Sequence, residues 1–279
     1  MMGVVDVKEE ISNKNIKMKN IISASRRVDM MNFYSEKLVN YVLNYGIENI
    51  HTLVIWTKNP EKIYKDAKIR ELINKLDQTF LLLTVTGLGG SFLERRVPSE
   101  EKVFSMLPNV IKMLKTPLRI NIRYDPLLDL EYKGYRITNI NLNKFKKIAK
   151  VIAKMGIPVI RVSYITLYNK ILKRFKKLGI TVLNHDIKEI EYFIKEKMMP
   201  VANDFGVQIK TCTYPDITSD GCINGKLLSS LHPKGEVCSY EKDKSQRERC
   251  HCTKSIDIGR WYSCLHGCLY CYGSPKLSL

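Results

Sequence analysis

Residues 52–58 read TLVIWTK, and runs of the same kind occur at residues 21–27 (IISASRR) and 80–87 (FLLLTVTG). Each run is apolar, is rich in β-branched residues and ends in polar residues, which is typical of a buried strand. Three further runs lie at residues 118–125, 158–165 and 207–213. Segments with helical spacing of apolar residues separate them, at residues 35–45, 60–76, 99–115, 143–155 and 187–205.

Strands that alternate with helices predict parallel βα units, as in an α/β barrel or a doubly wound sheet. About six units fit a partial, TIM-barrel-like (β/α) barrel better than the complete barrel of eight units. Residues 255–261, SIDIGRW, are a candidate seventh strand. No linker rich in Gly, Ser or Pro divides the chain, so the sequence predicts a single domain over residues 1–279. Its parts are an N-terminal extension (1–20), the βα units (21–211) and a cysteine-rich tail packed on the barrel (212–279).

The composition is that of a folded protein, with 44% hydrophobic and 27% charged residues among 279. No apolar run approaches the roughly 18–20 residues needed to cross a bilayer. Residues 1–20 are polar and lack the apolar stretch of a secretory signal. We therefore expect a cytoplasmic protein without a membrane partner.

The chain is strongly basic, with 46 Lys and Arg against 28 Asp and Glu and a formal net charge of +18. Between Tyr132 and His185 it has 13 basic residues and no Asp or Glu. Such a stretch favours a phosphate-bearing partner such as nucleic acid if the charge gathers on one face. It is equally compatible with a solvated lysine face, so charge alone leaves both interpretations open.

All eight cysteines lie in the last quarter of the chain, and in a reducing compartment such clustering indicates metal or redox chemistry rather than disulfides. Residues 264–272 read CLHGCLYCY, a CxxxCxxC spacing formed by Cys264, Cys268 and Cys271. Three thiolates in a tight loop can bind three corners of a four-iron, four-sulfur cluster and leave the fourth iron open. A zinc site is the alternative, with His266, His251 or another cysteine as its fourth ligand.

Four more cysteines form a second candidate metal site, at Cys212, Cys222, Cys250 and Cys252. Four thiolates can close a second, auxiliary iron–sulfur cluster completely, or a zinc site. We favour the cluster and leave zinc open. Cys238 is expected to remain a free thiol.

Ligand sites of parallel α/β folds lie beyond the carboxyl ends of the strands, where several polar residues of this chain fall. Each could instead be a capping or turn residue. The candidates at these strand ends are Ser23, Ser25, Arg26, Arg27, Thr57, Lys58, Asn59, Thr84, Thr86, the turn with Gly87, Gly89 and Gly90, Arg123, Asp125, Ser163, Tyr164 and Cys212.

The CxxxCxYC pattern of residues 264–271 resembles the cluster motif of the radical S-adenosylmethionine (radical SAM) superfamily. A longer resemblance runs from Ile21 onward, to the domain-of-unknown-function family 1848, whose C-terminal cysteines look like such a cluster. Met30-Met31, His251 and Asn224 depart from that family's pattern in loops. The segments that carry the resemblance are ISASRRVD (22–29), WTKNP (56–60), TVTGLGG (84–90), IRYDP (122–126) and KDKSQRERCHCTKSIDIGRWYSCLHGCLYCY (242–272).

The resemblance implies a radical SAM enzyme on a full or partial barrel. S-adenosylmethionine would chelate the open iron, and one-electron reduction would yield methionine and a 5′-deoxyadenosyl radical that abstracts hydrogen from a substrate. A reducing partner such as a ferredoxin or flavodoxin would supply the electron. Because the motif is C-terminal here, the resemblance also implies a permuted order in which residues 255–261 pair beside residues 21–27.

The resemblance further implies roles for the strand-end residues. The turn of Gly87, Gly89 and Gly90 would let the backbone of the chain approach the cofactor closely, and Tyr270 would line the adenine. Carboxylate, ribose or substrate phosphate would be held by Arg26, Lys58, Arg123 and Asp125. Candidate catalytic residues are Arg26, Asp125 and Tyr164, and the substrate is open, with nucleic acid one suggestion.

Two other classes of function compete with this interpretation. A nucleic-acid-binding protein stapled by zinc or an iron–sulfur cluster would use the basic stretch without radical chemistry, and it would bind RNA or DNA in a salt-sensitive way. An electron carrier with two clusters is less favoured, because a carrier needs no polar face at the strand ends.

Overall fold

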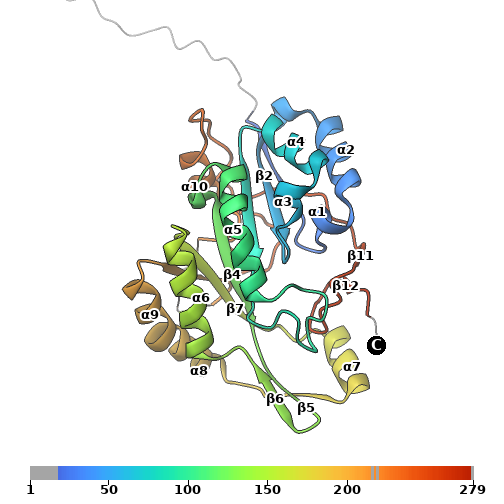
Figure 1. Ribbon diagram of the computed structural model, residues 1–279, viewed down its shortest axis with the longest axis vertical. Helices are drawn as coiled ribbons and strands as arrows, with labels where there is room; N and C mark the ends of the chain where they lie inside the picture. The colour runs from blue at the N-terminus through green and yellow to red at the C-terminus, as the bar shows by residue number, and fades with distance from the viewer. Residues whose placement is uncertain (1–17, 215–216, 218–219, 278–279) are drawn as a thin grey trace, which may run out of the picture.

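Seven parallel strands form the central sheet of the computed structural model, which describes residues 18–214, 217 and 220–277 (Figure 1). Their order is β10-β1-β2-β3-β4-β7-β9. Residues 1–17 of the predicted N-terminal extension lie outside the described residues. β10 and β9 stand at the two ends of this order, so the described strands form an open sheet and the barrel does not close. The α/β class is confirmed.

The predicted apolar runs are strands. Continuous burial along them explains their uninterrupted apolar sequences, because helices and the C-terminal tail cover both faces of the sheet. The strands are β1 (Asn20–Ala24), β2 (Ile50–Thr57), β3 (Thr79–Thr84), β4 (Ile120–Leu127), β7 (Val159–Tyr164) and β9 (Gln208–Thr211).

The C-terminal strand β10 (Ile256–Asp257) pairs in parallel with β1, with Ile22 opposite Ile256 and Ser23 opposite Asp257. The expectation that residues 255–261 lie beside residues 21–27 is therefore confirmed. This pairing brings the segment after residue 257 to the carboxyl end of the first strand.

The predicted helices are present, with two interruptions. The segment at 60–76 is divided because Asp66 is extended and its side chain accepts hydrogen bonds from the backbone N–H groups of Lys68 and Ile69, which caps a new helix. The segment at 187–205 contains a π-helical turn, Phe193–Met198. The helices are α2 (Ser35–Tyr45), α3 (Lys62–Lys65), α4 (Ala67–Lys75), α5 (Glu100–Leu114), α6 (Leu142–Lys154), α8 (Ile187–Tyr192) and α9 (Met199–Asp204).

Several elements were not expected from the sequence. A small antiparallel sheet contains β5 (Asp129–Tyr132), β6 (Tyr135–Thr138) and β8 (Ile180–Val182), and α7 (Asn169–Leu178) lies within the basic stretch. The short elements are α1 (Met30–Phe33), α10 (Gly225–Ser230), β11 (Ser263–Cys264), β12 (Ser274–Pro275) and the 3₁₀ turns Ile47–Asn49 and Pro117–Arg119. Among the residues that the structure describes, no helix is both long and apolar enough to cross a membrane.

The two faces of the sheet pack against different parts of the chain. Leu53 and Ile55 of β2 belong to the main core beneath the helices. Val54 and Trp56, on the opposite face, pack with buried residues of the tail such as Cys222 and Leu228. Alternation along one strand thus places the cysteine-rich tail on the face that the main helices leave open.

Candidate functional site

A cavity of about 350 Å³ opens at the carboxyl ends of the parallel strands. Its size falls within the range of small-molecule sites. Of the predicted site residues, Arg26, Lys58, Arg123, Asp125, Tyr164 and Tyr270 line it. Seven of the eight cysteines line it as well: Cys212, Cys222, Cys250, Cys252, Cys264, Cys268 and Cys271. All eight cysteines are free thiols.

The first group of thiols, Cys264, Cys268 and Cys271, lies on a short loop. Gly267 within this loop has φ +65°, and a Cβ there would lie 2.8 Å from the carbonyl oxygen of Lys276. A glycine is therefore required for the turn between the first two cysteines. Arg174 of α7 donates hydrogen bonds to the carbonyl oxygens of Leu269 (2.7 Å) and Cys271 (2.9 Å), which fixes the far end of the loop.

Burial dominates the ionisation of these three thiols. It raises the pKa of Cys264 to about 11, and it also raises the pKa values of Cys268 and Cys271. The ammonium group of Lys58 acts in the opposite direction on Cys268 and Cys271. Without a metal these thiols hold their protons, so metal binding would release them.

A buried contact between His266 and Asp29 anchors the same loop to the start of α1. His266 Nε2 lies 2.8 Å from Asp29 Oδ2, and Asp29 also accepts hydrogen bonds from Thr57 (2.6 Å) and Asn32 (2.9 Å). Burial alone would raise the pKa of Asp29, but the hydrogen bonds from His266, Thr57 and Asn32 lower it below its ordinary value. His266 is thus held by a carboxylate.

The thiols of the second group shift one another's pKa values pairwise, from Cys250 through Cys252 and Cys222 to Cys212. Hydrogen bonds from Cys222 and Cys250 lower the pKa of Cys252, and the hydrogen bond from Cys222 lowers that of Cys212. The same hydrogen bonds raise the pKa values of Cys222 and Cys250. Four thiols from three chain segments therefore line the same cavity, and neighbouring pairs of them affect each other's ionisation.

Two cationic side chains of the cavity lining, Arg26 and Arg123, lie near the ring of Trp56. The guanidinium carbon of Arg26 lies 5.5 Å from the centre of the Trp56 ring, and that of Arg123 lies 5.0 Å from the same centre. Arg123 forms an ion pair with Asp125, which also accepts a hydrogen bond from Ser163. Two guanidinium groups of the cavity lining thus lie beside one aromatic ring.

Lys58 and Tyr270 belong to a second charged network in the cavity wall. Lys58 Nζ lies 2.7 Å from Glu94 Oε1 and donates to the Tyr270 hydroxyl over 2.9 Å, and that hydroxyl donates to Glu94. Burial raises the pKa of Tyr270 well above its ordinary value, so the phenol stays protonated. The Tyr164 hydroxyl accepts a hydrogen bond from the backbone of His185 over 3.2 Å.

The structure does not bring the predicted glycine turn into the cavity lining. A Cβ at Gly89 would lie 2.1 Å from the carbonyl oxygen of Pro98, and one at Gly87 would lie 3.7 Å from Tyr124. Gly89 thus packs tightly against the backbone before α5, while Gly90 has open space around it. A cofactor role for these glycines stays a prediction.

Several residues of the site were not singled out by sequence reasoning, although a signal for some was present. Trp56 stands near the end of β2 and Asp29 caps α1 after β1, where ligand residues are expected, and both line the cavity. His266 was considered only as a zinc ligand. Arg247 and Gln246, which also line the cavity, come from a loop with no sequence pattern that places them there.

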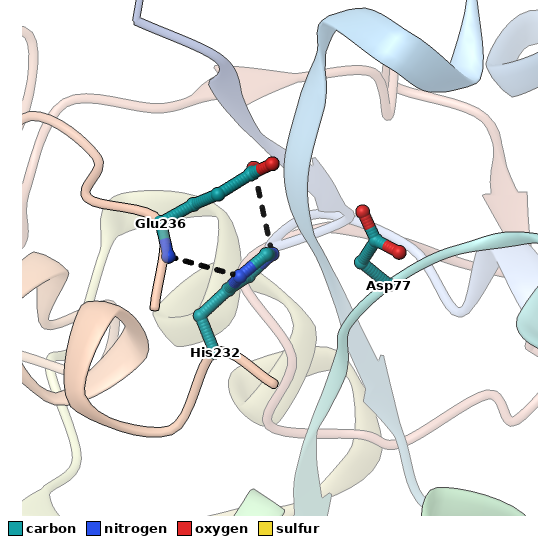
Figure 2. Close-up of side chains that lie close together, drawn as sticks. All are labelled: Asp77, His232 and Glu236. Carbon is teal, nitrogen blue, oxygen red and sulfur yellow. Dashed lines mark hydrogen bonds and ion pairs between the residues drawn. The ribbon is translucent and has the colours of Figure 1, made fainter. Parts of the chain in front are cut away.

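A third polar group lies outside the cavity lining, where Asp77, just before β3, meets His232 and Glu236 of the tail (Figure 2). Asp77, His232 and Glu236 each bring one ligand atom within 4.8 Å of the others, so they could hold a metal ion. The ammonium group of Lys234 lies 2.7 Å from Asp77 Oδ1, and that of Lys19 lies 2.7 Å from Glu236 Oε1. Because two ammonium groups already neutralise the carboxylates, we interpret this group as an ion-pair cluster between the tail and the sheet.

The basic stretch is divided between two places in the fold. α6 lies beside β7 and α9, and α7 lies on the other side of the molecule, near β12 (Figure 1). Lys146, Lys147 and Lys150 are exposed on α6, while Lys170 and Lys173 are exposed on α7. Only the α7 part lies next to the thiol-bearing loop, through Arg174.

The fold and the site define an α/β protein with an open parallel sheet and two groups of thiols at the carboxyl ends of its strands. The family model described as domain of unknown function (DUF1848) matches residues 21–273. The chain belongs to this family. None of the curated proteins compared with the chain matches it.

Proposed function

We propose that this protein is a radical SAM enzyme with two iron–sulfur clusters. The observation that carries the proposal is that Cys264, Cys268 and Cys271, in CxxxCxxC spacing, line the same strand-end cavity as the four-thiol group. When bound, the open cluster and S-adenosylmethionine would supply a 5′-deoxyadenosyl radical after one-electron reduction by a ferredoxin or flavodoxin.

The donor set supports an open cluster rather than a closed zinc site. Zinc needs four ligands, and the histidine within the loop is not offered as the fourth, because His266 Nε2 faces Asp29 and Nδ1 faces the carbonyl oxygen of Arg96. The second group has four sulfur atoms of its own, which suits a fully ligated auxiliary cluster.

The chain's own residues would bind the cofactor and exclude water. The positive charges of Lys58, Arg174 and Lys170 act to lower the pKa of Cys271. The positive charge of Arg26 acts to lower the pKa of Cys252. These cations would offset the negative charge of metal-bound thiolates in a buried cavity. Arg123 remains available to an anionic group, since its Nε is buried without a hydrogen-bond partner.

The test is anaerobic reconstitution with iron and sulfide, followed by reduction with dithionite in the presence of S-adenosylmethionine. We expect iron-dependent release of 5′-deoxyadenosine and methionine. Loading with zinc in place of iron, or an iron-loaded protein that leaves S-adenosylmethionine intact, would overturn the proposal. Zinc loading together with salt-sensitive binding of RNA would instead support a metal-stapled nucleic-acid-binding protein.

A further inference from the structure

Three exposed aromatic side chains form a patch at the mouth of the cavity. Trp261 is 56% exposed, Tyr168 42% and Tyr272 39%. The ring centres of Trp261 and Tyr272 are 6.4 Å apart, and those of Tyr272 and Tyr168 are 6.0 Å apart. Tyr168 and Tyr272 also line the cavity. We call these three residues the aromatic patch; it continues the cavity wall out to the surface.

Cations lie near two of these rings, Trp261 and Tyr272. Lys170 Nζ is 4.7 Å from the centre of the Trp261 ring and 6.0 Å from that of Tyr272. The guanidinium carbon of Arg27 lies 5.2 Å from the Trp261 ring centre, while its Nη1 donates to the carbonyl oxygen of Gly259 and lies 3.8 Å from Asp257. The patch therefore combines exposed π-faces with positive charge.

More positive charge extends from the patch along α7. Lys170 and Lys173 are exposed one helical turn apart, and Lys177 is exposed one turn further on. No acidic residue occurs in the sequence between Tyr132 and His185. A chain of phosphates can follow such a row, while a base stacks on the rings at its end.

We propose that the aromatic patch binds a nucleobase of a single-stranded nucleic acid, with the phosphates along α7; this assigns nucleic acid as the substrate class and rests on the proposed function. Stacking platforms flanked by cations are the physical basis of single-strand binding. A base within a duplex is stacked on both sides and has no free face to offer, so a duplex would bind more weakly. The patch would hold a strand so that its neighbouring nucleotide reaches the cavity.

The test is fluorescence anisotropy with a fluorescein-labelled single strand of about twelve nucleotides. The anaerobic, cluster-loaded protein is saturated with S-adenosylmethionine, so that the adenine of the cofactor does not compete. We expect Trp261→Ala to raise the Kd at least about fivefold, because stacking on that ring is lost. Trp261→Phe should keep most of the affinity. Lys170→Gln should reduce the slope of log Kd against log salt by about one.

Tyr135→Ala is the matched control, because Tyr135 is 77% exposed on β6 and lies outside the aromatic patch and the cavity lining. It should bind the strand as the wild type does. Equal affinity in Trp261→Ala and wild type, or a duplex bound as tightly as the single strand, would overturn the inference. A mononucleotide that competes as well as the strand would also overturn it in favour of a free nucleotide.

Cleavage of S-adenosylmethionine by the wild-type protein without any strand is measured on the same preparations. If cleavage occurs and strand binding does not depend on Trp261, only the assignment of nucleic acid fails. If cleavage fails while strand binding depends on Trp261, the proposed function fails and the patch remains a nucleic-acid site. The two failures are therefore distinguishable.

Discussion

His266 Nε2 lies 2.8 Å from Asp29 Oδ2, and this buried pair joins the thiol-bearing loop to the start of α1 across 237 positions of the chain. The imidazole also contacts the edge of Phe33, with ring centres 4.8 Å apart. The loop that carries Cys264, Cys268 and Cys271 is therefore fixed to the sheet by a charge-assisted contact in an apolar setting.

Asp29→Asn should destabilise the protein strongly. Asn lacks the buried negative charge that accepts hydrogen bonds from Thr57 and Asn32, and a hydrogen bond to a charged group contributes about 1.5–3 kcal/mol. Urea unfolding of the variant against the wild type measures the loss. Glu36→Gln is the control, since Glu36 pairs with Lys68 at the surface, where screening leaves little effect. Equal losses in both variants would contradict the assigned role of Asp29.

The same carboxylate predicts a pH dependence. The pKa of Asp29 in the folded protein is below its ordinary value of 3.8, so the folded state releases this proton more readily than the unfolded state. The resulting stability is present above pH 3.8 and is lost as the pH falls through the folded pKa. Acid titration of the unfolding free energy should show a steeper fall for the wild type than for Asp29→Asn. Parallel curves would contradict this.

Replacing single cysteines should separate the two thiol groups. Cys264→Ala should lower the iron content of reconstituted protein by about four atoms per chain, the content of one cluster. Cys222→Ala should remove a comparable amount from the second group. Cys238→Ala is the matched control, because Cys238 is buried and bonds to Ser229 and Gly225 but does not line the cavity. Full iron content in Cys264→Ala would count against the first cluster.

Gly221, next to Cys222 of the four-thiol group, allows a test of the close approach between two backbone segments. Gly221 has φ +76°, and a Cβ there would lie 2.4 Å from the carbonyl oxygen of His251. Gly235 has φ +65° but open space around it. Both replacements by Ala carry the cost of positive φ, and only Gly221→Ala adds a clash with backbone. Thermal unfolding should therefore show a larger drop in Tm for Gly221→Ala; an equal drop would contradict the close approach.

The sequence predicted the main strands because buried parallel strands are continuous apolar runs. It did not predict β5 and β6, which are four residues long and partly exposed, nor α7, where only Ile171 and Phe175 are buried. It predicted the permuted pairing of β10 through a resemblance. In the described part of the chain β9 and β10 end the strand order without pairing to each other, which is compatible with an incomplete barrel, and the TIM-barrel-like form stays a prediction.

For the candidate site, the spacing of residues in the sequence predicted neighbouring thiols only within the loop of Cys264, Cys268 and Cys271. The three terminal cysteines are close in sequence, so their convergence followed from their spacing. The gathering of Cys212 and Cys222 with Cys252, and of Asp29 with His266, depends on contacts between distant segments. No local pattern encodes such contacts, because the fold alone brings these segments to one edge of the sheet.

The buried His232 predicts a second pH dependence, near neutrality. Its Nδ1 accepts hydrogen bonds from the backbone N–H groups of Lys234 (3.4 Å) and Glu236 (3.3 Å), and its ring stacks on His51 with centres 4.4 Å apart. These contacts suit the neutral ring, and burial together with the neighbouring His51 lowers the pKa of His232 below its ordinary value of 6.5.

The unfolded state therefore binds this proton more readily than the folded state. The stability that depends on neutral His232 is present above pH 6.5 and falls as the pH decreases toward the folded pKa. His232→Gln removes the titrating group, so its unfolding free energy should depend less on pH between about 7.5 and 5 than that of the wild type. His251→Gln, at an exposed position, should keep the wild-type dependence. If His232→Gln follows the wild-type curve, the ring is protonated equally in both states and the ion-pair cluster does not depend on its neutral form.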